Sequence, residues 1–324
     1  MITSVLLFAV GLVLLIKGGD WFVDGATGIA KRFNLPDIVV GATVVSIGTT
    51  LPEVMVSTTG ALAGSGAMAY GNAIGSIICN TALIAAISIT CNPGPVNVKS
   101  MKTPAIFFFG AAAMYCVAAY GLGTFPRWLG FIMLAVFAVY MVLTVRNGLK
   151  NPDTSAAEEE DESKPKKLWQ ELLLLVVGAA VIAVGADLLV EHGQIIAIGL
   201  GVPETVVALL FVALGTSLPE LVTTITSLKK GRTSLGVGNV IGANVFNLVL
   251  VSGVAVSLAP FDVPVENELL NTGLNLSLVF DIPVMLLVMS LMIFPALLSK
   301  KLGRWQGIAL LGIYAAFVVC QFVL

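Results

Sequence analysis

The sequence contains few charged residues and almost no histidine. Only 11% of its 324 residues are Asp, Glu, Lys or Arg, there is one histidine, and the formal net charge is −2. A soluble domain carries about 25% charged residues, so this composition excludes a water-soluble globular protein. The lack of net positive charge also excludes a basic surface for nucleic acid.

The four cysteines show no spacing typical of a metal or redox site. Cys79, Cys91, Cys116 and Cys320 lie in or beside apolar segments, and no two of them form a Cys-x-x-Cys pair. We interpret them as small buried hydrophobic residues. Because His192 is the only histidine, soft metals lack a ligand set, and we expect no cofactor.

Long apolar segments take the place of the missing polar residues, and 57% of the chain is hydrophobic. About 20 such residues are enough to cross a bilayer as a helix. Ten helices are separated by breaks at residues 33–36, 63–67, 91–100, 120–127, 147–167, 199–203, 229–234, 259–272 and 299–304. The sequence therefore predicts an all-α integral membrane protein with ten transmembrane helices.

Basic residues predict the orientation of these helices. Fifteen of the 17 Lys and Arg residues fall in odd-numbered loops, Arg127 alone falls in an even-numbered one, and Lys17 lies in the first helix. Cytoplasmic loops are enriched in Lys and Arg. We therefore expect a multi-pass protein in the lipid of the cell membrane, with both termini extracytoplasmic.

The two halves of the chain are related by an internal repeat. A shift of 167 positions aligns residues 48–53 with 215–220 and residues 71–80 with 238–247, and after ten more positions residues 127–130 align with 304–307. Since each half holds five helices, the second half enters the membrane from the opposite side, as in many secondary transporters. A purely structural scaffold is the alternative.

This repeat divides the chain into three parts. We predict a first repeat at residues 1–148 with its motif in 36–80, a cytoplasmic linker at 149–167, and an inverted second repeat at 168–324 with its motif in 203–247.

Two glutamates lie inside apolar segments. Glu53 and Glu220 are about halfway along the second and seventh helices, and each follows a proline. An ionisable group at the centre of a span costs about 2.5–3.5 kcal/mol on insertion scales. Proline lacks an N–H and frees the carbonyl one turn earlier. We therefore predict that the second and seventh helices are broken and present carboxylates, carbonyls and hydroxyls to one place.

Such a set of oxygens favours hard cations, above all Ca²⁺. Asn80 and Asn247 hold equivalent positions on the third and eighth helices and complete the set; hydrogen bonding between helices is the alternative for either one alone. We interpret Asp20 and Asp187 as structural or as attracting cations, and we expect no enzymatic activity.

With these residues together, the chain resembles a prokaryotic sodium/calcium exchanger of the cation/Ca²⁺ exchanger superfamily. The motifs at 48–53 with 71–80, and at 215–220 with 238–247, are similar to the two α-repeats that define this family. The resemblance implies an antiporter that exchanges Na⁺ for Ca²⁺ across the cell membrane by alternating access, with the first and sixth helices sliding across the core. We expect it to work as a monomer.

The resemblance also implies the ligands. Glu53 and Glu220, with the carbonyls of Thr49 and Thr216, would hold Ca²⁺. Sodium would occupy flanking sites that share the glutamates and add Thr50, Ser76 and the Ser46 carbonyl on one side, Ser217 and the Ala213 carbonyl on the other, and Asn80 and Asn247 in the middle.

Two positions depart from the family pattern. Ala243 stands where family members usually carry a serine, so one sodium site loses a hydroxyl. Asn247 stands where K⁺-dependent exchangers carry an aspartate, which favours K⁺ independence. The linker is too short for the folded Ca²⁺-sensing domains of animal exchangers.

Several alternatives remain at this point. A Ca²⁺/H⁺ antiporter could use the same glutamates, since carboxylates inside a membrane can be discharged by protons. Mn²⁺ or another hard divalent ion could be the substrate. A passive channel predicts flux without a counter-ion gradient, and an intramembrane hydrolase predicts dependence on Asp20 rather than on Glu53.

Overall fold

The computed structural model describes residues 2–150, 167–200, 215–264 and 275–323, and these residues are almost entirely helical. Within these described ranges, eight helical stretches are long and apolar enough to cross a membrane: Ile2–Arg32, Asp37–Leu62, Gly66–Cys91, Val98–Leu122, Arg127–Lys150, Leu168–Ile196, Thr233–Leu258 and Ser277–Ser299. They coincide with eight of the ten predicted helices. At the expected places of the seventh and tenth helices lie α10 (Leu218–Lys229) and α14 (Arg304–Val323).

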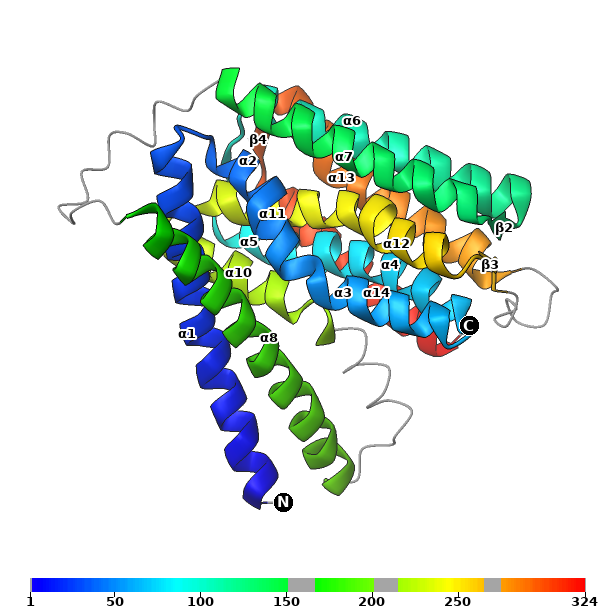
Figure 1. Cartoon of the computed structure of the whole chain (residues 1–324), viewed down its shortest axis with the longest axis horizontal. Coiled ribbons are helices and arrows are strands. Elements are labelled where there is room, and N and C mark those ends of the chain that lie inside the picture. The colour runs from blue at the N-terminus through cyan, green and yellow to red at the C-terminus, as the bar shows by residue number, and fades with distance from the viewer. Residues whose placement is uncertain (1, 151–166, 201–214, 265–274, 324) are drawn as a thin grey trace.

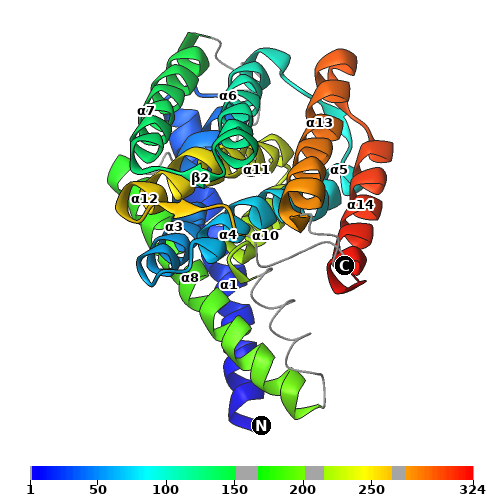
Figure 2. The same cartoon turned by 90° about the vertical axis from the view of Figure 1, so that its right-hand side faces the viewer.

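The first and sixth predicted helices, α1 (Ile2–Arg32) and α8 (Leu168–Gly199), form an antiparallel pair that projects from the other helices (Figures 1 and 2). Glycines let their backbones touch: a Cβ added at Gly11 would lie 2.9 Å from the Gly185 carbonyl oxygen, and one added at Gly18 would lie 3.0 Å from that of Gly178. Close packing between small residues stabilises helix pairs in membranes.

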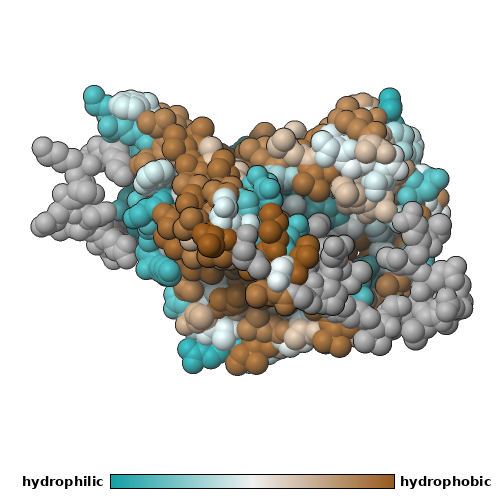
Figure 3. Space-filling model, turned by 90° about the horizontal axis from the view of Figure 1, so that it is seen from below, coloured by the Kyte–Doolittle hydropathy of each residue, from teal (hydrophilic) through white to brown (hydrophobic). Residues whose placement is uncertain are grey.

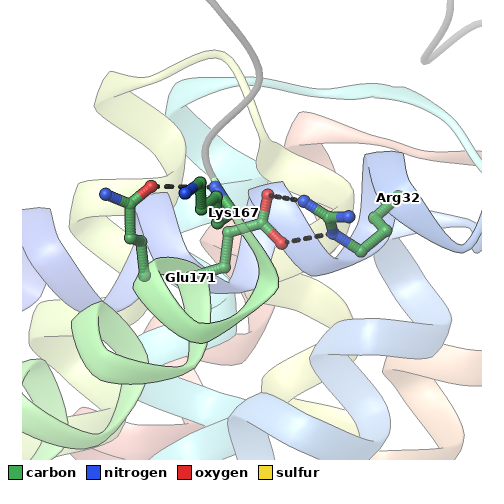
Figure 4. Close-up of polar contacts among 4 residues, drawn as sticks. Arg32, Lys167 and Glu171 are labelled. Atoms are coloured by element: carbon green, nitrogen blue, oxygen red, sulfur yellow. Dashed lines mark hydrogen bonds and ion pairs between the residues drawn. The ribbon is translucent and has the colours of Figure 1, made fainter.

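The outer surface of this pair is apolar, as expected for a surface that faces lipid. Figure 3 shows a largely brown surface over the region where α1 and α8 project. Val5 and Val13 on α1 and Leu173 and Val176 on α8 are exposed apolar side chains. At the basic end of the pair, the Arg32 guanidinium binds the Glu171 carboxylate at 2.9 and 3.4 Å (Figure 4).

Three spans contain π-helical segments between α-helical ones. The second span is α2 (Asp37–Val40), η1 (Gly41–Val45) and α3 (Ser46–Leu62); the third is α4 (Gly66–Cys79), η2 (Asn80–Ala85) and α5 (Ala86–Cys91); the eighth is α11 (Thr233–Phe246), η5 (Asn247–Val251) and α12 (Ser252–Leu258). Asn80 and Asn247 each begin a π-helical segment, a feature frequent at functional sites.

The remaining helices pack around these three spans. They are α6 (Val98–Cys116) with η3 (Val117–Leu122), α7 (Arg127–Lys150), η7 (Ser277–Asp281) with α13 (Ile282–Ser299), and α14. Two short antiparallel pairs join their connections: β1 (Gly94–Pro95) with β4 (Lys301–Leu302), and β2 (Thr124–Phe125) with β3 (Phe261–Asp262).

The predicted break of the second helix is wrong. Helix α3 continues through Pro52, which lies inside it. Proline removes one backbone hydrogen bond, and packing against the neighbouring helices keeps the helix intact without that bond. In the seventh helix, α10 begins at Leu218 with Pro219 in its first turn, and Thr216 and Ser217 are in a turn. The residues before Gly215 that would complete this helix lie outside the described ones.

The glycine contact of α1 with α8 predicts a strong effect of Gly18→Leu. We expect lower thermal stability of the purified protein, because the new side chain meets backbone that cannot move aside, and overpacking of this kind costs about 1–3 kcal/mol or more. The measurement is the fraction that stays monodisperse after heating in detergent.

Gly110→Leu is the matched control, since Gly110 is exposed and a Cβ there meets nothing within 4 Å. Equal heat resistance of both variants would contradict the packing argument.

Candidate cation-binding site

Two glutamates from different halves of the chain lie in one buried region. Glu53 on α3 and Glu220 on α10 are both fully buried. Thr50, one turn before Glu53, donates its hydroxyl to Glu220 Oε1 at 3.4 Å. The motif of the first half therefore reaches the carboxylate of the second.

Many polar atoms in this region have no partner. Both carboxylate oxygens of Glu53, Oε2 of Glu220, Oγ of Ser217 and the side-chain amides of Asn80 and Asn247 are buried and accept or donate no hydrogen bond among the described residues. A buried polar group without a partner costs about 1–3 kcal/mol, so such groups call for an ion or ordered water. This concentration of oxygens fits a hard cation.

The predicted ligand residues are buried, with two exceptions. Ser46, Thr49, Thr50, Glu53, Ser76, Asn80, Ser217, Glu220 and Asn247 are all buried. Thr216 is half-buried, and Ala213 lies outside the described residues. Ala243, which replaces the serine of the family pattern, is fully buried on α11.

Two asparagines, Asn72 and Asn239, connect the halves, and the sequence analysis gave them no role. Thr49 Oγ1 donates to Asn239 Oδ1 at 3.1 Å, and Thr216 Oγ1 donates to Asn72 Oδ1 at 3.4 Å. The two contacts are equivalents under the 167-residue shift. Each asparagine therefore orients a threonine of the opposite half, and that threonine lies one turn before a glutamate. Both asparagines stand inside the repeated motifs, and this position in the sequence could have pointed to their role.

Ser46 adds a further contact between the halves. Its hydroxyl donates to the Gly41 carbonyl at 2.8 Å and lies 2.9 Å from the Asn239 carbonyl. The hydroxyl thus bridges η1 and α11, while the predicted ligand atom of this residue is its carbonyl oxygen.

The two aspartates of the α1–α8 pair do not meet. Asp20 lies 3.6 Å from Lys230 Nζ, and Asp187 is exposed. Because Gly11 packs on Gly185 and Gly18 on Gly178, Asp20 and Asp187 are separated by roughly 16 Å along the pair, at 1.5 Å per residue. They are too far apart for a pair of catalytic carboxylates.

Comparison with known proteins shows the family of the chain. A family profile described as "Sodium/calcium exchanger protein" matches residues 3–146 and 171–323. The curated "Sodium/calcium exchanger MaX1" of Methanosarcina acetivorans is 28% identical over 352 residues, which cover 98% of this chain and 98% of that protein. The "Inner membrane protein YrbG" of Escherichia coli is 30% identical, with 96% of this chain and 94% of that protein covered.

The fold is also similar to a solved structure. A structure of the sodium-calcium exchanger NCX_Mj, soaked with zero Na⁺ and Ca²⁺, superposes with a TM-score of 0.79 at 31% sequence identity and covers 99% of both chains. The likeness of sequence and fold extends over nearly the whole chain, and the protein belongs to the sodium/calcium exchanger family.

Proposed function

We propose that this protein exchanges Na⁺ for Ca²⁺ across the cell membrane by alternating access. Family membership supports cation/Ca²⁺ exchange by a multi-pass membrane protein. The observation that carries the finer proposal is the buried group of unpartnered oxygens around Glu53 and Glu220. Two carboxylates that form no ion pair with a basic side chain of the described residues suit one divalent cation, or sodium ions in its place.

We also propose ten helices arranged as two inverted repeats. Exchanged contacts support this: a Cβ added at Gly130 would lie 2.9 Å from the Gly253 carbonyl oxygen, and one added at Gly307 would lie 2.7 Å from that of Ala86. Gly253 is the equivalent of Ala86, and Gly307 that of Gly130. Two repeats related by a two-fold axis make every contact between them twice in this way.

The ligand assignment follows the repeat. Ca²⁺ is held by Glu53, Glu220 and the carbonyls of Thr49 and Thr216, and Na⁺ takes the flanking groups. In support, the hydroxyls of Thr49 and Thr216 donate to asparagines of the opposite half, which fixes the two threonines close to the glutamates.

Competition for the carboxylates couples the two ions. The site cannot carry Ca²⁺ and a full sodium load together, and with no ion it would hold two uncompensated buried charges, a costly state to pass through a closed intermediate. Each ion shifts the equilibrium between the inward-open and outward-open states only by its differential affinity for them. Asn247 in place of an aspartate supports K⁺ independence. The Lys and Arg residues of the odd-numbered loops support a cytoplasmic position for the side of the protein that carries those loops.

Glu220→Gln is expected to lower Na⁺-driven ⁴⁵Ca²⁺ uptake into proteoliposomes by more than about 100-fold. The substitution removes one carboxylate from the bound cation, and loss of one partner of a buried pair of opposite charges costs about 3–5 kcal/mol. Glu191→Gln is the control, since Glu191 is an exposed glutamate on α8. Normal uptake by the Glu220 variant would exclude this carboxylate as a ligand.

The counter-ion is tested by imposing one gradient at a time on the parent protein. We expect a Na⁺ gradient to drive ⁴⁵Ca²⁺ uptake, with no change on adding K⁺ and no uptake driven by a pH gradient alone. If a pH gradient in sodium-free vesicles drives uptake and sodium adds nothing, the protein is a Ca²⁺/H⁺ antiporter instead.

Ala243→Ser is expected to restore a sodium ligand. One added hydroxyl contact should lower the Na⁺ concentration for half-maximal exchange by about two- to tenfold, because this factor corresponds to the free energy of one hydrogen bond. Ala255→Ser, at another fully buried alanine in the same span, controls for the added hydroxyl itself. Identical sodium dependence in all three proteins would remove Ala243 from the sodium site.

A further inference from the structure

Helix α10 carries a second group of buried hydroxyls beyond Glu220. The side chains of Thr223, Thr224 and Ser227 are 0%, 1% and 0% exposed. None of their three hydroxyl oxygens has a hydrogen-bond partner among the described residues. We call these three residues the hydroxyl row.

The hydroxyl row continues the face of α10 that carries Glu220. Residues three, four and seven positions apart lie on one side of a helix, so Thr223, Thr224 and Ser227 form a line that begins at the carboxylate. Thr226 belongs to another face, because a Cβ added at Gly19 of α1 would lie 2.9 Å from its Oγ1. The hydroxyl row therefore points away from α1.

Helix α10 contacts α11 and α5, which lie beside it in Figure 1. A Cβ added at Gly236 of α11 would lie 3.2 Å from the Thr224 Cα atom, so the backbones are close there. On α5, the Ser88 hydroxyl is buried and also without a partner in the described part of the chain. The helix α5, which α10 contacts, therefore carries one more buried hydroxyl of the same kind.

The repeat shows that packing does not require these hydroxyls. The equivalents of Thr223 and Ser227 on α3 are Val56 and Gly60. Thr224 corresponds to Ser57, whose hydroxyl accepts a hydrogen bond from Asn72 Nδ2 at 2.8 Å. The second half therefore has hydroxyls where the first has apolar groups or a satisfied hydroxyl.

Some hydroxyls in the other spans bind the carbonyl one turn earlier in their own helix. Thr43 Oγ1 donates to the Val39 carbonyl at 2.7 Å, and Thr59 Oγ1 donates to the Met55 carbonyl at 2.8 Å. The hydroxyl row does not take this option, so its oxygens remain available to another ligand.

The row ends below a surface pocket. The Ser227 carbonyl accepts a hydrogen bond from the Arg232 N–H at 2.7 Å, and the loop that follows contributes Gly231, Thr233 and Ser234 to a pocket of about 290 Å³. Ile89 and Asn92, next along the chain from Ser88, line its other side. The pocket opens among the basic loops.

We propose that the hydroxyl row lines the route of transported cations between Glu220 and this pocket. The inference rests on the proposed exchange function. A hard cation that leaves the carboxylates needs oxygens to replace its lost water, and the row offers one at each turn of α10. The route is shut in this conformation, since all three side chains are buried.

The first test compares Thr223→Val and Ser227→Ala with Thr226→Val. The first two remove row hydroxyls at little change in volume, whereas Thr226→Val removes one on the face towards α1. We expect the first two to slow Na⁺-driven ⁴⁵Ca²⁺ exchange by about two- to tenfold each, the cost of one lost oxygen contact. Thr226→Val should keep the parent rate, and equilibrium ⁴⁵Ca²⁺ binding in detergent should be unchanged in all three.

The second test locates the route from each side of the membrane. In the full chain with its four cysteines changed to alanine, Ser227→Cys and Thr226→Cys are treated with a small cationic thiol reagent on one face at a time. We expect the Ser227→Cys thiol to react from the face of the basic loops only, and more slowly when Ca²⁺ is added. The Thr226→Cys thiol should stay unreactive.

These outcomes separate the route from the exchange function. If the parent exchanges but both row variants match Thr226→Val and the Ser227→Cys thiol is inert from both faces, the route is overturned and exchange stands. If the parent shows no coupled flux, the exchange proposal fails, and protection of the Ser227→Cys thiol by Ca²⁺ still decides whether cations reach the row.

Discussion

The whole structure depends on keeping two carboxylates in an apolar interior. Glu53 and Glu220 are fully buried, and no basic side chain of the described residues pairs with either. Burying an unpaired charge is among the costliest events in folding. Three kinds of group make that interior polar enough to hold an ion reversibly. They are the surrounding hydroxyls, the amides at the starts of π-helical segments, and the asparagine–threonine contacts between the halves.

Much of this arrangement could be predicted from the sequence, because it repeats. The aligned motifs at 48–53 and 215–220 identified both glutamates and most of the polar groups now seen buried with them. The π-helical segments could not be predicted, since they depend on packing rather than on local composition. The continuity of α3 through Pro52 was missed for the same reason: neighbouring helices, which a motif does not show, hold the backbone in place.

The departures from symmetry are as informative as the repeat. Asn244 Nδ2 donates to Thr81 Oγ1 at 2.7 Å, although the equivalents of these residues are Ile77 and Leu248. The hydroxyl row is likewise confined to the second half. The two halves thus share their carboxylates but differ in the polar groups around them.

The crossed contacts between the halves have a consequence for how the chain is made. The groups that surround Glu53 and its motif, among them Glu220 and Asn239, lie in the half that is synthesised last. Gly130 likewise packs against Gly253, which belongs to the second half. While the ribosome is still producing the later helices, the nascent first half must sit in the bilayer with an unsatisfied acid. The polar surroundings of Glu53 are therefore complete only when both halves are present.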